Sequence, residues 1–274
     1  SEEHFFPWSP DSPFLYDLTV GTTQGEEEGF DTVHSYFALR KWECREDGRG
    51  IKRFFLNGKP ILLNGLLDQG YWPEGLYTPP SDGAVEHDLH TVRELGFNLL
   101  RKHAKVEPER WYYHCDKLGI IVWQDMVNGG GAYPMWYVTY LTNALQPLLR
   151  YAPDGKLLWG LLGRGSARSG EEYSRELADT VAALGQHPSI GCWVPFNEGW
   201  GQFDAEKATK ALRALDPTRL VDEASGWFDR GGGDVHSIHN YFYPLRIRPN
   251  VRTVALSEYG GIAWPMPGHE PPRK

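Results

Sequence analysis

Two glutamates stand at the ends of apolar runs, where a carboxylate is costly unless it has a partner or a task. Glu198 follows Asn197 at the end of CWVPFNE, and Glu258 ends VALSE. A carboxylate buried without a partner is strongly disfavoured, so we expect both side chains to meet other polar groups. Two facing carboxylates can cleave a glycosidic bond, because one protonates the leaving oxygen while the other attacks or stabilises the anomeric carbon.

Other polar residues end the neighbouring apolar runs. Arg101 could hold one of two facing carboxylates ionised by charge pairing, while the other keeps its proton. Asp125 and Glu223 also fit helix caps or salt-bridge partners. His236 and His239 have the spacing of metal ligands on a helix, but on a strand they point to opposite faces, so we expect no metal site. The polar residues at predicted strand ends are Asp68, Arg101, His103, Asp125, Asn197, Glu198, Glu223, His239, Tyr241 and Glu258.

An alternation of strands and helices from about residue 51 predicts the elements that carry these side chains. Continuous apolar strands separated by amphipathic helices indicate a parallel sheet covered on its outer faces. In an α/β barrel the chemistry lies at the carboxyl ends of the strands, so Glu198 and Glu258 would face each other across that rim. The seven predicted strands begin near residues 60, 97, 120, 189, 219, 235 and 254, and the predicted helices cover 82–96, 107–119, 171–185 and 204–215.

The predicted fold class is α/β, with a (β/α)8 TIM-type barrel over residues 48–274 that is truncated before its eighth strand. An open doubly wound sheet is the alternative, but no GxGxxG follows the first strand, which disfavours a dinucleotide-binding protein. Residues 1–47 contain two or three alternating strands, too few to bury a face alone, so we expect the last strands of a β-sandwich there. Residues 127–169 exceed an ordinary connection and predict a lid or subsite loop.

Composition disfavours several classes of partner. The formal net charge of −8 and the pI near 5.7 argue against nucleic acid or an anionic membrane, because both need a basic face. No apolar run approaches the roughly 18 residues that span a bilayer.

The three cysteines have no paired spacing, so they predict neither a disulfide framework nor zinc, and they suit a reducing cytoplasm without excluding the periplasm. The start SEEHFF lacks Met and a signal pattern, so we expect a longer parent protein.

Four segments resemble the barrel domain of glycoside hydrolase family 2, which includes β-galactosidases, β-glucuronidases and β-mannosidases. They are FFLNGKPILLNGLLDQGYWPEGLYTPP, LGFNLLRKHAKVEPERWYYHCDKLGIIVWQDM, HPSIGCWVPFNEGWGQFD and LSEYGG. The likeness runs from about residue 51 to 264, and residues 1–45 are similar to the end of the immunoglobulin-like sandwich that precedes the barrel there. One departure is RKHAKV, where many members have Arg-x-Ser-His-Tyr-Pro, so the usual histidine is displaced or absent.

The resemblance implies a retaining exo-β-glycosidase that hydrolyses terminal β-linked sugars by double displacement, with β-galactosidase-like activity favoured. Glu198 would be the general acid and then the general base, and Glu258 the nucleophile, about 5 to 5.5 Å away. Asn197 would bond the 2-hydroxyl of the sugar, and Arg101 would orient the nucleophile. Support for the nucleophile would come from His239 or Tyr241, and sugar contacts from Asp68, Trp72, Asp125 and Trp200.

The implied substrate is a glycoside, oligosaccharide or polysaccharide, with no cofactor and no metal. Family members often assemble through their sandwich domains, which leaves a homo-oligomer of the full-length parent open. The alternative function is a non-catalytic carbohydrate-binding relative, or an inactive fragment of such an enzyme, and a nicotinamide-dependent oxidoreductase is the third hypothesis. The sugar and linkage stay open, because one hydrogen bond to an axial or equatorial hydroxyl can decide specificity.

Overall fold

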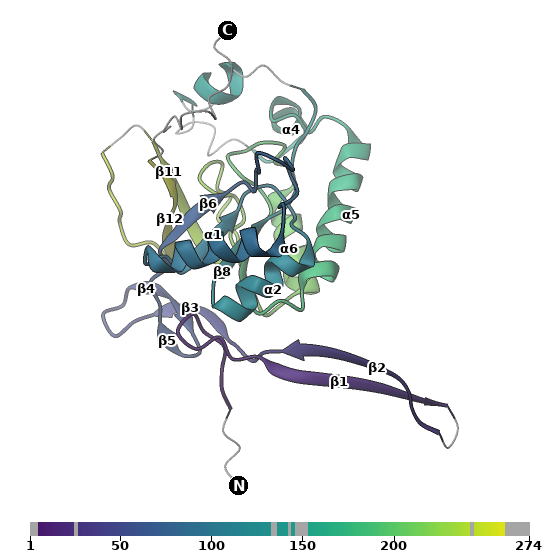
Figure 1. Ribbon diagram of the computed structural model, residues 1–274. Coiled ribbons are helices and arrows are strands. Elements are labelled where there is room, and N and C mark those ends of the chain that lie inside the picture. The colour runs from purple at the N-terminus through teal and green to yellow at the C-terminus, as the bar shows by residue number, and fades with distance from the viewer. Residues whose placement is uncertain are drawn as a thin grey trace.

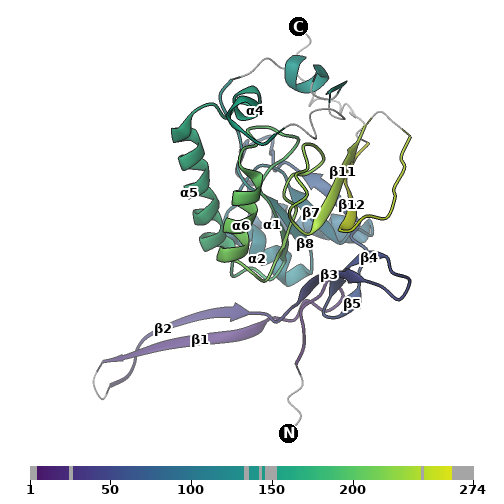
Figure 2. The same cartoon turned by 180° about the vertical axis from the view of Figure 1, so that it is seen from behind.

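The computed structural model describes residues 5–24, 27–132, 136–141, 144–145, 153–241 and 244–260. Within these ranges, seven strands that pair in parallel and the helices between them form the main body of the molecule (Figures 1 and 2). Parts of the predicted loop at 127–169 and the region of an eighth strand lie outside the described residues. No described helix combines the length and the apolar character needed to cross a lipid bilayer.

The parallel strands form a five-stranded sheet in the order β10-β9-β8-β7-β6 and a separate pair, β11-β12. Every residue of β7, β8 and β9 is buried, as expected of strands covered on both faces. The seven predicted strands are confirmed, but the first begins at Gly65 and not near residue 60. Their bounds are β6 Gly65–Asp68, β7 Leu99–Lys102, β8 Ile121–Asp125, β9 Ile190–Val194, β10 Leu220–Val221, β11 Val235–Asn240 and β12 Thr253–Tyr259.

Helices cover the outside of the five-stranded sheet (Figure 1). Ser81 caps the first of them by accepting a hydrogen bond from Ala84 N at 3.1 Å. Gly119 closes the second at a φ of 73°, a conformation that suits glycine. Apolar side chains from these helices, such as Leu89 and Leu212, pack in one core with Trp193 of β9. The helices are α1 Asp82–Glu94, α2 Glu109–Leu118, the π-helical turn η1 Tyr137–Leu141, α4 Lys156–Leu161, α5 Ala167–Leu184 and α6 Ala205–Leu215.

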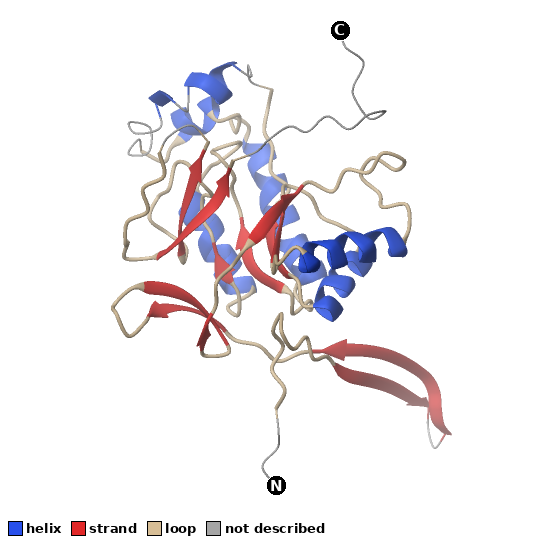
Figure 3. Cartoon of the chain, turned by 60° about the vertical axis from the view of Figure 1, so that its left-hand side comes forward, coloured by secondary structure: helices blue, strands red, loops and turns tan. Residues whose placement is uncertain are grey.

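A long antiparallel hairpin, β1 Tyr16–Gln24 and β2 Glu27–Phe37, extends away from the main body (Figures 1 and 3). Its base is joined to the amino-terminal ends of the parallel strands. Tyr36 donates a hydrogen bond to Asp116 Oδ2 at 2.7 Å, and Arg40 donates to Thr218 O at 3.0 Å. These polar contacts fix the direction in which the hairpin leaves the body.

A second antiparallel sheet lies beside the parallel strands and contains β3 Trp42–Glu46, β4 Lys52–Leu56 and β5 Lys59–Pro60 (Figure 3). The short β5 pairs with β4, which explains why residues 60–64 do not join the first parallel strand. The predicted domain boundary at residue 47 falls in the turn between β3 and β4, two strands of the same sheet. The division into a sandwich over 1–47 and a barrel over 48–274 stays a prediction.

A largely apolar cavity of about 970 Å³ separates β6 from β12. Leu66, Leu99 and Leu256 contribute to its lining, and it reaches Arg101 and Glu258 at the end where the candidate site lies. Among the described residues, the candidate site therefore adjoins this cavity between β6 and β12.

Candidate active site

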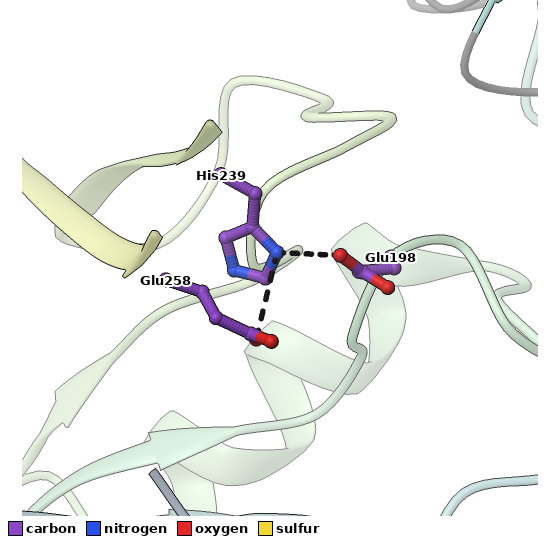
Figure 4. A group of neighbouring side chains, drawn as sticks. All are labelled: Glu198, His239 and Glu258. Atoms are coloured by element: carbon purple, nitrogen blue, oxygen red, sulfur yellow. Dashed lines mark hydrogen bonds and ion pairs between the residues drawn. The ribbon is translucent and has the colours of Figure 1, made fainter. Parts of the chain in front are cut away.

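Glu198 and Glu258 meet at the carboxyl ends of the parallel strands (Figure 4). Glu198 follows β9, while Glu258 lies on β12 in register with His239 of β11. A carboxylate oxygen of Glu198, a carboxylate oxygen of Glu258 and a ring nitrogen of His239 all lie within 4.8 Å of one another. Two carboxylates from segments far apart in the chain therefore come close together at one rim of the parallel strands.

His239 stands between the two carboxylates. Its Nδ1 lies 2.9 Å from Glu198 Oε1 and 3.7 Å from Glu258 Oε2. Its Nε2 lies 3.2 Å from Nη1 of Arg101. A guanidinium can only donate, so Nε2 must be the accepting nitrogen and Nδ1 carries the proton. His239 therefore donates its hydrogen bond to Glu198.

Tyr241 adds a second donor to the same carboxylate, with its hydroxyl 2.6 Å from Glu198 Oε1. Burial by itself would raise the pKa of Glu198, but hydrogen bonds from His239 and Tyr241 and the charge of Arg101 outweigh burial and lower that pKa. The resemblance predicted that His239 or Tyr241 supports Glu258. In the structure their shortest hydrogen bonds reach Glu198, but Tyr241 also bonds the Glu258 carboxylate, and His239 Nδ1 lies 3.7 Å from it. The residue predicted to hold a proton is thus the one whose ionised form is stabilised. Support of Glu258 by His239 or Tyr241 stays a prediction.

Arg101 joins the ends of four strands from a position that is 3% exposed. Its Nη1 lies 3.4 Å from Glu258 Oε2. The predicted role of Arg101 in orienting Glu258 stays a prediction. Its Nε and Nη2 each donate to one oxygen of Asp125 at 3.0 Å. Both oxygens of the buried Asp125 are therefore engaged by the guanidinium, which fits the salt-bridge alternative, and a sugar contact by Asp125 stays a prediction.

Asn197 is held between Arg101 and His103. Its Oδ1 accepts a hydrogen bond from Nη2 of Arg101 at 2.8 Å, and its Nδ2 lies 2.9 Å from His103 Nε2. Because Arg101 cannot accept, the amide oxygen must face it. Among the described residues, the second hydrogen on Nδ2 has no acceptor. His103 belongs to the RKHAKV segment that departs from the family pattern, and the sequence placed it at a strand end without predicting a role for it. The one feature of the sequence that pointed to His103 as a site residue was its position two residues after Arg101.

The backbone at Glu198 is held in an unusual conformation. Its φ is 52°, a region that non-glycine residues seldom occupy, and the next residue, Gly199, has a φ of 74°. The Glu198 N–H donates to Ser225 O at 3.0 Å, and Arg164 donates from Nε to Gly201 O at 3.1 Å. Arg164 comes from the predicted lid segment, so part of that segment anchors the turn that presents Glu198. Strain of this kind is concentrated at functional sites.

Three further residues predicted to contact sugar have other partners in the structure. Asp68 Oδ2 accepts from Lys102 Nζ at 2.6 Å. The partly buried Trp72 packs against the core that includes α1, and the carbonyl oxygen of Trp200 accepts a hydrogen bond from the side chain of Asn128. Sugar contacts by Asp68, Trp72 and Trp200 stay predictions.

Within the part of the chain that the structure describes, one group of acidic and histidine side chains has a geometry that could hold a metal ion, namely Glu198, His239 and Glu258. A metal would need the lone pair of Nδ1, yet Nδ1 carries the proton as long as Arg101 donates to Nε2. The fixed charge of Arg101 beside Glu258 also opposes a cation. The cluster therefore suits proton transfer better than metal binding.

A family model described as "Glycosyl hydrolases family 2, TIM barrel domain" matches residues 49–241. The chain belongs to glycosyl hydrolase family 2. Similar curated proteins include a β-galactosidase of Leuconostoc mesenteroides, 24% identical over 229 residues, which cover 83% of this chain and 19% of that protein. An exo-β-D-glucosaminidase of Streptomyces avermitilis is 27% identical over 222 residues, covering 77% and 21%. This family 2 chain thus spans about a fifth of the length of these relatives.

Solved structures show the same fold. A β-D-glucuronidase from Dictyoglomus thermophilum superimposes with a TM-score of 0.65 at 18% identity, covering 86% of this chain and 38% of that one. A family 2 β-galacturonidase from Eisenbergiella tayi gives 0.62 at 19% identity, covering 86% and 38%. The family and the (β/α)8 barrel fold predicted for this family 2 chain are therefore confirmed.

Proposed function

We propose that the protein is a retaining exo-β-glycosidase that hydrolyses terminal β-linked sugars by double displacement. The observation that carries the proposal is the pair Glu198 and Glu258, whose carboxylate oxygens approach within 4.8 Å. Retaining glycosidases hold their carboxyl groups about 5 to 5.5 Å apart, whereas inverting enzymes need about 6.5 to 9.5 Å to admit a water. An upper limit of 4.8 Å between these oxygens supports a retaining mechanism with a covalent intermediate.

In the first half of the reaction, Glu258 attacks the anomeric carbon. Arg101, 3.4 Å from its Oε2, favours the ionised carboxylate that this attack requires. A bond forms between the Glu258 oxygen and the anomeric carbon while the glycosidic bond breaks, and its electron pair stays on the leaving oxygen. Glu198 gives that oxygen a proton, so the aglycone departs as an alcohol.

In the second half, Glu198 removes a proton from water, and the water oxygen attacks the anomeric carbon and releases the Glu258 carboxylate. The lowered pKa of Glu198 suits this role as a base. This step returns a proton to Glu198, but the hydrogen bonds from His239 and Tyr241 favour its ionised form. If that proton leaves for another group between turnovers, it must return to Glu198 before the next bond cleavage.

A β-galactoside is the favoured substrate, and a β-glucuronide or β-mannoside follows closely. Curated relatives named β-galactosidase support the first choice. Relatives and solved structures named β-glucuronidase support the second. A single hydrogen bond to one sugar hydroxyl or carboxylate is enough to separate these substrates.

The test uses aryl β-galactoside, β-glucuronide and β-mannoside with the wild-type protein, Glu258→Ala and Glu198→Ala. Both variants are expected to lose turnover. Added azide should then give glycosyl azides of opposite anomeric configuration in the two variants. Azide attacks the covalent intermediate of Glu198→Ala from the β face, whereas in Glu258→Ala it enters the vacated α face. The matched control is Glu223→Gln, a buried carboxyl that contacts Thr209 and not the site. Sugar binding without hydrolysis in the wild type would support the carbohydrate-binding alternative instead.

A further inference from the structure

A buried chain of hydroxyl groups runs from His239 to Asp222 beneath the candidate site. Ser225 Oγ lies 2.9 Å from His239 Nε2 and 3.3 Å from Ser237 Oγ. Ser237 Oγ in turn lies 2.8 Å from Asp222 Oδ2. Ser257 of β12 adds a branch, with a short hydrogen bond to Ser237 and a contact of 3.4 Å to Ser225. An unbroken path of hydrogen bonds therefore links a buried carboxyl to the histidine that contacts Glu198.

Asp222 has the properties of a group that can hold a proton. It follows β10 and is 1% exposed, and its Oδ1 has no hydrogen-bond partner within the described residues. Burial raises the pKa of Asp222 to about 6, although the charge of Arg101 and the hydrogen bond from Ser237 act in the opposite direction. A carboxyl of this kind exchanges its proton close to neutral pH, and neither half of the proposed reaction uses it.

We propose that Asp222 is the proton store of the site and exchanges one proton with Glu198 through Ser237, Ser225 and His239. The inference rests on the proposed function. Asp222 gives its proton to Ser237 Oγ, and Ser237 passes its own hydroxyl proton to Ser225. Ser225 then protonates His239 Nε2, and the Nδ1 proton moves to Glu198 Oε1. One proton leaves Asp222, one arrives on Glu198, and the reverse sequence restores the start after water is deprotonated.

The charges around this chain of hydroxyl groups decide which group holds the proton in the resting state. Arg101 donates towards His239 Nε2 at 3.2 Å, which disfavours a proton resting on that nitrogen. Below about pH 6 the proton therefore rests on Asp222 while Glu198 is ionised, in agreement with the raised pKa of Asp222 and the lowered pKa of Glu198. The titratable and charged groups that face the chain from the surrounding elements are Arg101 of β7, Asp125 of β8, Cys192 of β9, Tyr241 after β11 and Glu258 of β12.

The kinetic test compares a dinitrophenyl glycoside, whose leaving group departs without acid assistance, with a phenyl glycoside, which needs it. Asp222→Asn and Ser237→Ala should lower kcat/KM for the phenyl glycoside roughly tenfold or more and leave the dinitrophenyl glycoside within about twofold, because only acid catalysis is lost. Glu223→Gln removes the neighbouring buried carboxyl, which is bonded to Thr209 and Gly232, and should affect neither substrate. Equal losses on both substrates in Asp222→Asn would mean a structural role and would overturn the proposal.

A second measurement does not depend on activity. In protein labelled with 13C at the aspartate carboxyls, one signal should titrate at about pH 6 and be missing in Asp222→Asn. Its midpoint should rise in Ser237→Ala, because the hydroxyl that stabilises the ionised carboxylate is gone. If this signal is present but the wild type hydrolyses no glycoside, the proposed function fails, and the proton exchange with Glu198 fails with it, although Asp222 is still a buried carboxyl that titrates. If every aspartate is already ionised well below that pH, the store is refuted whatever the activity.

Discussion

Removing the phenol of Tyr241 is expected to raise the pKa of Glu198. The hydroxyl donates to Glu198 Oε1 at 2.6 Å, and Tyr241→Phe deletes this bond while leaving the one from His239 at 2.9 Å. A hydrogen bond to a charged group contributes about 1.5 to 3 kcal/mol. Since one pKa unit corresponds to about 1.4 kcal/mol, the pKa of Glu198 should rise by about one to two units.

The sign follows from the depressed pKa of Glu198 in the folded protein. A carboxyl of this kind contributes stability above its unfolded pKa, and that contribution is lost as the pH falls through the folded value. In Tyr241→Phe the contribution is smaller, and its loss is complete at a higher pH because the folded pKa is higher. The assay is the 13C titration of the Glu198 carboxyl, assigned with Glu198→Gln, together with the free energy of unfolding measured in urea across the acidic range.

The matched control is Tyr36→Phe, which removes a phenol bonded to Asp116 at 2.7 Å at the opposite end of the strands. It should lower the free energy of unfolding without moving the titration of Glu198. A midpoint for Glu198 that stays constant or falls in Tyr241→Phe would refute the conclusion that Tyr241 stabilises the ionised carboxylate, and with it the assignment of Glu198 as the resting base.

Three further predictions concern the scaffold. Trp8 is fully buried and donates from Nε1 to Asp116 O at 2.8 Å, so Trp8→Ala should lower the free energy of unfolding in urea by about 3 to 5 kcal/mol. In Gly201→Ala the new Cβ would overlap Gly129 O at a φ of 62°, so calorimetry should show a lower Tm and assays a lower kcat. Burial would raise the pKa of Asp229, but hydrogen bonds from a histidine and an arginine hold this pKa well below its usual value. The ionised carboxylate therefore contributes stability above about pH 4 that is lost as the pH falls further. Asp229→Asn should remove this contribution, as measured by urea unfolding at a series of pH values.

Much of the framework could be predicted from local patterns. The apolar runs of β7, β8 and β9 and the glycine after α2 locate these elements within a few residues, because periodicity and capping act over short stretches of chain. The exception was the segment at 60–64, where a two-residue strand pairs with β4 and delays the first parallel strand to Gly65. An apolar run alone does not show which partner a strand will choose.

The sequence predicted the carboxylates of the candidate site but not the hydrogen bonds that connect its residues. Glu198 and Glu258 could be found because each directly follows or ends a buried strand, and Arg101 because it lies on one. The partners of His239 could not, since its bond to Glu198 at 2.9 Å and its separation of 3.7 Å from Glu258 differ by less than 1 Å. The role of His103 could not be predicted either, because its contact with Asn197 joins segments far apart in the sequence.

The sequence by itself determined which residue types stand at the strand ends, and therefore that two carboxylates and a guanidinium would share one rim of an α/β barrel. Only the tertiary structure decided which carboxylate is held ionised and that a chain of serine hydroxyls leads from it to Asp222. The physical reason is the distance in sequence over which each effect acts. Residue order sets which side of a strand a group faces, whereas pKa values and hydrogen bonds depend on ångström-scale distances between segments far apart in the chain.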